Sequence, residues 1–346
     1  MTAFTCPVPF SGRTEITVAH GGGGKLTQEL IDGIFRPAFG AAAGEPPHDG
    51  AVLPVAGARI AFTTDAHVVS PLFFPGGSIG SVAVNGTIND LAMCGARPRW
   101  LSASFVIEEG FAIATLRRIA EEMGRVAAAA GVSIVTGDTK VVERGKGDGL
   151  YVSMAGVGIL EHGLQIGPAS IAPGDAVVLS GDIGRHGMAI LAQREGLNFA
   201  APIASECAPL AASVQALLAA GLEVHCLRDL TRGGLATALI ELAEASETAF
   251  TISEPAVAVD EVVRGACEIL GLEPAYVANE GRFVCILPAR QANAAVRILR
   301  GVAPGGSAAA YIGFVAAGPG AVRLRSIIGA ERILDRLSGE QLPRIC

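Results

Sequence analysis

The chain has 346 residues, of which half are hydrophobic, 45 are glycine and only 5% are aromatic. A chain of this length exceeds the size at which single cores stop growing, so we expect two domains built from close-packed layers of helix and sheet. The net charge is −7 and the basic residues form no block, which argues against nucleic acid as a partner.

The first residues show no charged leader followed by an apolar core, and no uninterrupted apolar run of about 18 residues occurs. We therefore expect a cytoplasmic protein without a membrane-spanning segment. The seven cysteines form no CxxC pair and no ligand-like cluster, a usage typical of reduced thiols.

A glycine loop stands near the start of the chain. Residues 15–20, EITVAH, predict a short strand, and apolar residues at helical spacing predict a helix over residues 26–35. The loop between them consists of Gly21, Gly22, Gly23, Gly24 and Lys25. Its backbone amides are suited to a phosphate, although a flexible linker is the alternative. It is not a Walker A loop, because Ala19 and Leu26 break that pattern.

The next two elements present polar residues at their ends. Residues 57–69 predict a strand that delivers Asp65 and His67 near its end. Residues 76–96 predict a helix, and two polar residues lie beside its apolar stripe, namely Asn89 and Asp90.

A longer helix is predicted over residues 113–130, where apolar residues recur at spacings of three and four. Residues 132–160 then predict a strand, a polar loop and a second strand, with Asp138 and Lys140 where the first strand ends. This alternation of strands and helices predicts an α+β domain with helices on one face of a sheet.

A stretch rich in Gly and Pro around Ile171 has the composition of a joint between domains. Beyond it we predict helices after SGDIGRHG and after LRDLTRGG, the latter capped by Asp229 or Thr231, and a short helix after residue 325. The expected organisation is a glycine-loop segment (residues 1–42), an N-terminal domain (43–170), a C-terminal α/β domain (171–318) and a tail (319–346).

Three carboxylates end up at the ends of predicted elements: Asp65, Asp90 and Asp138. Carboxylates gathered at one sheet edge are the ligands that Mg²⁺ uses when it also binds a nucleotide, so with the glycine loop they suggest ATP. Each one alone is equally well explained as a helix cap or a turn residue.

Other candidates are weaker. His67 and His186 lack partners at metal-ligand spacing, which favours hydrogen-bonded histidines. Lys140 and Glu280 are charges at the edges of otherwise apolar strands, where a solvated surface residue is the alternative to a catalytic one.

Eight motifs occur in a fixed order along the chain: HGGGGK, TTDAHVVSPLFFPGG, NGTINDLAMCGA, TGDTKVV, GDIGRHGMAIL, DLTRGGL, NEGRF and the terminal PRIC. Together they resemble the HypE family of hydrogenase maturation proteins over nearly the whole chain, from about His20 to Cys346. Each motif alone is weak, but the ordered set is specific, and the PRIC end separates this family from its relatives.

The resemblance implies the two-domain fold of aminoimidazole ribonucleotide synthetase and a homodimer joined through the N-terminal sheets. It also implies an ATP site in the N-terminal domain, where the glycine loop folds over the phosphates and Mg²⁺ is bound by Asp65, Asp90 and Asp138. His67 and Asn89 would belong to the same nucleotide site.

The reaction that the resemblance implies is ATP-dependent dehydration of a carbamoyl group on Cys346, at the end of a flexible tail. The thiocyanate product would supply cyanide ligands for the iron of [NiFe]-hydrogenase. Glu280 is the first choice for the base and Lys140 for the group that polarises the oxygen, and these roles are interchangeable at this stage.

The implied partners are the carbamoyltransferase HypF as donor and the HypC–HypD complex as acceptor. The sequence is also compatible with two other functions. One is a different ATP-dependent synthetase of the same superfamily, and the other is a non-catalytic binding protein whose terminal PRIC is a docking peptide.

Overall fold

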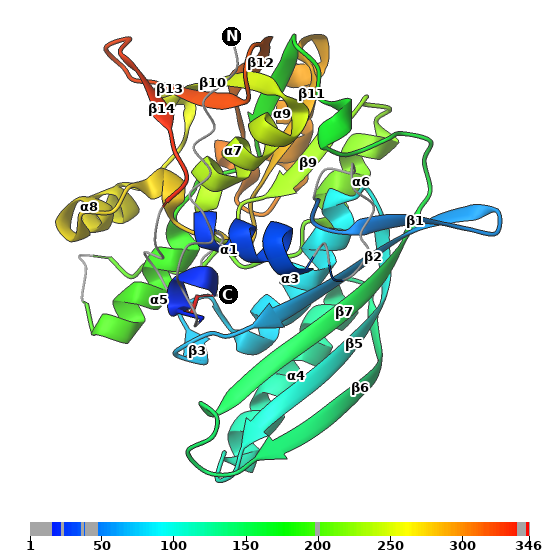
Figure 1. Cartoon of the computed structure of the whole chain (residues 1–346), viewed down its shortest axis with the longest axis vertical. Helices are drawn as coiled ribbons and strands as arrows, with labels where there is room; N and C mark the ends of the chain where they lie inside the picture. The colour runs from blue at the N-terminus through cyan, green and yellow to red at the C-terminus, as the bar shows by residue number, and fades with distance from the viewer. Residues whose placement is uncertain are drawn as a thin grey trace.

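The computed structural model describes residues 16–21, 24–35, 38, 48–197, 201–337 and 344–345. Two main sheets dominate the fold, one of five strands in the N-terminal half and one of seven in the C-terminal half (Figure 1). The chain passes from the first sheet to the second between Leu160 and Asp175.

The N-terminal sheet has the strand order β1-β2-β7-β5-β6, in which only β5 and β6 are parallel. Its strands are β1 (Ala51–Val55), β2 (Ala58–His67), β5 (Arg97–Glu108), β6 (Ser133–Val142) and β7 (Leu150–Leu160). Successive side chains of a strand point to opposite faces, and in β7 every second residue from Leu150 to Gly158 is buried. One face of this sheet therefore belongs to the core.

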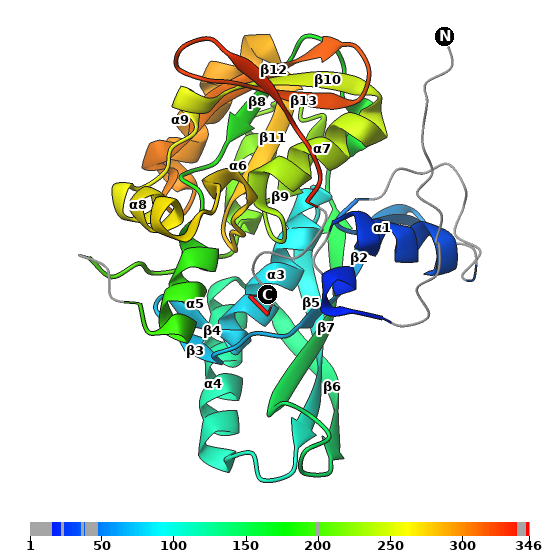
Figure 2. The same cartoon turned by 60° about the vertical axis from the view of Figure 1, so that its left-hand side comes forward.

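Two helices cover that face, α3 (Ile79–Met93) and α4 (Ile113–Ala129), as Figure 2 shows. Ser78 begins α3 with a capping box, in which its side chain accepts hydrogen bonds from the first-turn amides. Every residue of α3 except Asp90 is buried. The helix α4 buries only a stripe, so it forms the outer layer.

The C-terminal sheet has the order β14-β13-β10-β12-β8-β11-β9, with only β10 and β13 parallel. Its strands are β8 (Asp175–Leu179), β9 (Cys226–Asp229), β10 (Thr248–Ser253), β11 (Phe283–Pro288), β12 (Ala310–Ala317), β13 (Ala321–Arg325) and β14 (Glu331–Leu334). The central strands β8 and β11 are buried along their whole length, as expected for a sheet that is covered on both faces.

The helices of the second half are α5 (Arg185–Glu195), α6 (Ala211–Ala219), α7 (Gly234–Ser246), α8 (Glu261–Leu270) and α9 (Ala292–Val302). One face of the sheet packs against α7, through Leu235 and Leu239. The other face packs against α6 and α9, and Met93 at the end of α3 joins that cluster. Helix α3 therefore contacts both halves of the molecule.

Short elements complete the described chain. A 3-10 turn (Val18–Gly21) precedes α1 (Lys25–Leu30), which continues as a π-helical turn (Ile31–Phe35). The two-residue strands β3 (Phe73–Phe74) and β4 (Gly77–Ser78) pair with each other. Further 3-10 turns are Pro168–Ser170, Glu254–Ala256, Pro274–Tyr276, Ala289–Gln291 and Gly306–Ala308.

Two predicted elements are wrong. The strand expected over residues 15–20 is a turn in its described part, because the Thr17 and His20 backbones bond to each other and pair with no described strand. The short helix expected after residue 325 is a hairpin, in which Gly329 takes a φ of 81° and Ser326 bonds to Ala330. The expected tail segment thus begins with two strands of the C-terminal sheet.

The predicted helix over residues 113–130 is confirmed as α4, and the strands that carry Asp65 and Asp138 are confirmed as β2 and β6. Strand β5, which lies between β7 and β6, was not predicted. Among the residues that the structure describes, no helix is long and apolar enough to cross a membrane.

Candidate active site

A cleft of about 580 Å³ lies where α1, α3, α7 and the end of β9 meet. The two halves of the chain both contribute to its wall, which is strongly charged and more acidic than basic. The charged residues of the wall are Asp32, Asp49, Asp65, Asp90, Arg228, Asp229, Arg232, Glu241, Glu244, Glu280 and Arg336.

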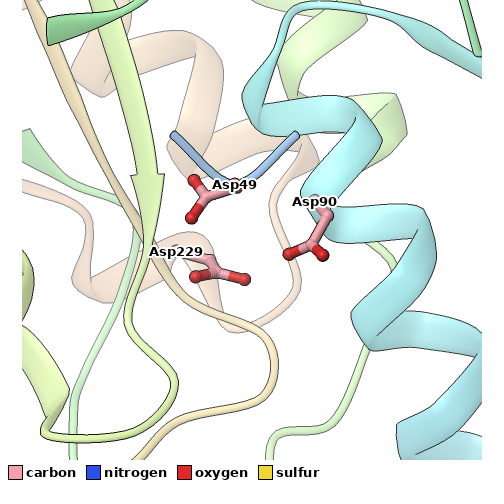
Figure 3. Close-up of side chains that lie close together, drawn as sticks. All are labelled: Asp49, Asp90 and Asp229. Carbon is pink, nitrogen blue, oxygen red and sulfur yellow. The ribbon is translucent and has the colours of Figure 1, made fainter. Parts of the chain in front are cut away.

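Three aspartates converge on one point of this cleft (Figure 3). Asp49 comes from the segment before β1, Asp90 from α3 and Asp229 from the end of β9, and one carboxylate oxygen of each lies within 4.8 Å of the others. The Thr63 hydroxyl donates to Asp90 at 2.8 Å and so fixes its orientation. A cluster of this kind joins the N-terminal and C-terminal halves.

The electrostatics of the three aspartates favour a bound cation. Burial, and then the carboxylates of Asp229 and Asp49, raise the pKa of Asp90 well above its usual value. Burial and Asp49 likewise raise the pKa of Asp229. A divalent cation with a preference for oxygen ligands, such as Mg²⁺, fits this set because it would neutralise the mutual repulsion.

Asp49 behaves differently because it has a cationic neighbour. Burial alone would raise its pKa, but the Arg228 guanidinium, 2.9 Å away, and the neighbouring His48 hold it below the usual value. Arg228 also pairs with Glu241 at 2.5 Å. Asp49 is therefore the member of the cluster that stays ionised.

Glu280, which was predicted from the sequence, is a buried carboxyl group in the wall of the same cleft. Its Oε1 has no hydrogen-bond partner among the described residues. Burial, and then Asp229 and Asp65, raise its pKa well above the usual value. Its backbone is fixed, since its N–H donates to Glu206 at 3.0 Å, so an acceptor is held in place without a partner in the described part of the chain.

Asp65 and His67 lie on the same side of the cleft as Glu280. A Cβ atom placed on Gly86 of α3 would lie 3.2 Å from the His67 ring, 3.4 Å from an Asp65 oxygen and 3.9 Å from a Glu280 oxygen. The three groups therefore meet where α3 lacks a side chain. Burial lowers the pKa of His67 although Asp65, 3.4 Å from its Nε2, opposes the shift, so His67 is neutral.

Asn89 has a different position from the one expected of a nucleotide ligand. Its side-chain amide donates to the Ala208 carbonyl at 3.1 Å and its oxygen accepts from the Leu210 amide at 2.8 Å. These bonds tie α3 to the segment before α6. A direct contact with a nucleotide would require Asn89 to give them up.

Asp138 and Lys140 do not reach the cleft within one chain. Asp138 lies opposite Ser104 of β5, and Ser104 lies opposite the exposed Ser153 of β7. Asp138 is therefore on the face of the sheet that no described helix covers. Asp65 points to the helix-covered face, so the sheet itself separates the two carboxylates. Of the three aspartates predicted to bind the metal, only Asp90 belongs to the cluster, and Asp65 lies beside it.

The glycine loop is described in part. Gly21 ends the 3-10 turn and Gly24 precedes α1, while Gly22 and Gly23 lie outside the described residues. Helix α1 and the turn after it line the cleft through Gln28, Ile31 and Asp32, and Gly24 directly precedes that helix. Lys25 is 3.5 Å from Asp335, in the segment that follows β14.

The predicted carrier residue Cys346 also lies outside the described residues. The two residues before it that the structure describes, Arg344 and Ile345, lie against the beginning of α5 and the loop before β3. The end of the expected tail is thus attached to the N-terminal half of the molecule as well as to α5.

Asp49, Arg228 and Asp229 were not predicted as site residues. Asp229 ends a strand, which is the feature that selected Asp65 and Asp138, but the sequence LRDLTRGG suggested a helix cap instead. In the structure Gly233 precedes α7, and no side chain of the described residues caps that helix. Asp49 gave no signal beyond its place in a loop.

Residues 47–160 match the family described as AIR synthase related protein, N-terminal domain, and residues 172–324 match the corresponding C-terminal domain. The carbamoyl dehydratase HypE of Azotobacter vinelandii is 49% identical over 332 residues, which are 96% of this chain and 97% of that protein. This chain belongs to the HypE family.

Solved structures of HypE proteins agree with this assignment. A HypE structure in complex with ATP has a TM-score of 0.81 and 44% identity, and the match covers 96% of this chain and 100% of that one. A HypE–HypF complex gives a TM-score of 0.84 and 41% identity, covering 89% of this chain and 99% of that one. The predicted two-domain α+β fold of the AIR synthase type is confirmed.

Proposed function

We propose that the protein is an ATP-dependent carbamoyl dehydratase of hydrogenase maturation, which converts a carbamoyl group on the Cys346 thiol to a thiocyanate. The observation that carries this proposal is Glu280, a buried carboxyl group whose Oε1 has no partner among the described residues, in the same cleft as the Asp49–Asp90–Asp229 cluster. Relatives that are about half identical carry the name carbamoyl dehydratase HypE, and one HypE structure contains ATP.

The reaction needs a phosphoryl donor and a base. An S-carbamoyl group has a poor leaving oxygen, so transfer of the ATP γ-phosphoryl group to that oxygen turns it into part of a phosphate. Loss of phosphate with the nitrogen protons then leaves a carbon–nitrogen triple bond. Glu280 is the base, because it lines the cleft, its Oε1 has no partner among the described residues, and its raised pKa makes it a stronger proton acceptor than an ordinary carboxylate.

Mg²⁺ would be held by Asp90, Asp229 and the ionised Asp49, with Asp65 beside them. When bound there it supplies positive charge next to the phosphates of ATP. The glycine loop, from Gly21 to Lys25, is the element that covers the phosphates, since the helix that follows it lines the cleft.

We further propose a homodimer joined through the uncovered faces of the N-terminal sheets. Phe62, Val157 and Trp100 lie opposite one another across β2, β7 and β5 on that face, and Phe62 and Trp100 are 43% and 48% exposed. An apolar row of this kind, on a sheet face that no described helix covers, favours association. Asp138 and Lys140 lie on the same face and would belong to this interface, and we propose that the dimer brings Lys140 of the partner subunit to the cleft.

The proposed partners act before and after the dehydration. A HypE–HypF complex of relatives supports HypF as a partner, and we propose that it is the carbamoyl donor. The HypC–HypD complex is the proposed acceptor, because a thiocyanate needs an iron-bearing protein to receive its cyanide.

The intact mass of the full chain tests the function. Incubation with HypF and its carbamoyl donor should add one carbamoyl group to the C-terminal peptide, and Mg-ATP should then remove one water. Protein that gains the carbamoyl group but keeps its mass with Mg-ATP would contradict the proposal, as would a modified peptide that contains a different cysteine.

A further inference from the structure

The residues before Cys346 are bound at a defined place in the fold. Ile345 is only 4% exposed and belongs to the same apolar cluster as Phe74 and Met188. Its carbonyl oxygen lies 2.6 Å from Nε2 of His186, the second residue of α5. The protein therefore binds both the side chain and the carbonyl group of Ile345.

The neighbouring residue, Arg344, is held by three further contacts. Its carbonyl accepts from the Ser70 backbone amide at 3.1 Å and from Arg194 at 2.8 Å, and its guanidinium pairs with Asp148 of the β6–β7 loop. Arg344 adopts a φ of 59°, which residues with a side chain seldom do unless contacts fix them. The contacts of Arg344 and Ile345 thus hold these two residues in one bent backbone conformation.

His186 is well suited to this role. It is fully buried, and its second ring nitrogen lies 2.8 Å from the Ser205 hydroxyl, which also accepts from the Cys207 amide at 3.1 Å. Burial lowers the pKa of His186 to about 4, so the ring is neutral. Because the Ile345 carbonyl can only accept, the ring proton is on Nε2, and Nδ1 accepts from the Ser205 hydroxyl. Phe74 packs edge-on against the ring, with centroids 5.5 Å apart.

The same segment contacts Glu280. Ser205 bonds to His186, and the next residue, Glu206, accepts the Glu280 backbone N–H at 3.0 Å. Two consecutive residues thus connect the receptor for Ile345 to the backbone of the base. Glu280 itself lies in the wall of the cleft, so this segment links the contact of Ile345 to the cleft.

We propose that His186, Arg194 and Ser70 form a receptor that holds the C-terminal arm beside Glu280 for the dehydration step. His186 is a positioning residue, because it acts on the arm and not on the reacting atoms. The effect of this receptor on dehydration rests on the proposed function. The binding of the C-terminal arm to the receptor does not, and it can be measured separately.

The first measurement is the alkylation rate of Cys346 by iodoacetamide, followed on the C-terminal peptide of the full chain by mass spectrometry. Ile345→Asp and His186→Ala should each raise this rate about tenfold, the change expected when one buried contact is lost. His186→Gln keeps a donor at the end of the side chain and should return towards the wild-type rate. Ile328→Asp is the matched control, since Ile328 is 86% exposed at the β13–β14 turn.

The second measurement is the single-turnover loss of water from protein that already carries the carbamoyl group. Ile345→Asp and His186→Ala should slow it about tenfold, with an unchanged Kd for ATP and no slower loading by HypF. Unchanged alkylation in both variants would overturn the receptor, and faster alkylation with undiminished dehydration would overturn its role in the dehydration step. If wild-type protein alkylates slowly but never loses water, the receptor stands and the proposed function fails.

Discussion

The two groups of polar residues that β2 and β6 carry have opposite environments. Asp65, on β2, faces α3 and shares a crowded, buried cleft with Asp90 and Glu280. Asp138 and Lys140, on β6, are exposed and 2.9 Å apart, and the hydrogen bond from Lys140 lowers the pKa of Asp138. In the cleft, burial and repulsion between carboxylates raise the pKa values of Asp90 and Glu280. On the face of the N-terminal sheet that no described helix covers, here called the open face, an ion pair lowers the pKa of Asp138.

Side chains of a strand alternate between the two faces of a sheet, so residues that the sequence assigns to one site can lie on opposite faces. Asp65 and Asp138 are such a pair. A chain by itself assembles the cation cluster and the base, but not Lys140. In the proposed dimer the open face would become part of a site only through a second copy of the chain, so the cleft and the open face should respond differently to substitution.

The largest effect is expected inside the cleft. Glu280→Gln removes the base but keeps the shape of the side chain, so dehydration of carbamoylated protein should fall about 10³-fold. Loading of Cys346 by HypF should persist. Single-turnover mass measurement checks both steps, with Glu331→Gln, at an exposed position on β14, as the matched control. Equal rates in the two variants would show that another group is the base.

Asp90→Asn tests the cation cluster in two ways. ATP turnover should fall on the order of 100-fold, because one of the oxygen anions around the cation is lost. Without a divalent cation the variant should instead melt about 2–4 °C above the wild type, since a repelling charge is gone. A variant that melts lower without a cation would contradict the repulsion.

The repulsion between the aspartates also predicts how the stability of the protein without a cation changes with pH. The folded-state pKa of Asp90 is raised above the usual 3.8, so the stability due to its protonated form is complete below that value. It is lost as the pH rises through the folded pKa. Thermal melting without a cation should therefore show a steeper decline with rising pH in the wild type than in Asp90→Asn.

Mixing two inactive variants tests the open face. If Lys140 serves the partner's cleft, subunit exchange between Lys140→Ala and Glu280→Gln should produce dimers with one intact site. A random equal mixture should then regain about a quarter of the wild-type dehydration rate. Each variant alone should stay inactive, so no recovery after verified exchange would show that Lys140 does not serve the partner's cleft.

The smallest effect is expected at Gly86. Gly86→Ala puts a methyl group against His67 and Asp65, so dehydration should slow about threefold by displacing groups near the base. Gly124→Ala, on α4, is the control, because a Cβ there meets no atom of the described residues within 4 Å. Both changes raise helix propensity by a similar amount, so a difference in rate between the variants isolates the effect on the cleft.

Part of this arrangement could be predicted from the sequence, because the alternation in β2 and the long apolar stretch of α3 place Asp65 and Asp90 on the correct elements. The side of the sheet on which Asp138 lies was not predictable, since it depends on the register of β6 with the unpredicted strand β5. Register is a property of pairing and cannot be read from one strand.

Asp49 and Asp229 show a second limit of the sequence. They belong to different halves of the chain, and their proximity depends on the packing of α3 against both halves. The receptor for Ile345 has the same origin, as Ser70 is remote in the sequence from His186 and Arg194 of α5. Local patterns carry no information about such contacts.

The near-complete burial of α3 has a consequence for how the two halves hold together. Asp90, its one residue that is not fully buried, meets Asp49 from the same half and Asp229 from the other. A cation that binds only the assembled cluster adds its binding free energy to the association of the halves. The fraction of molecules in which the two halves separate would then fall as the cation concentration rises.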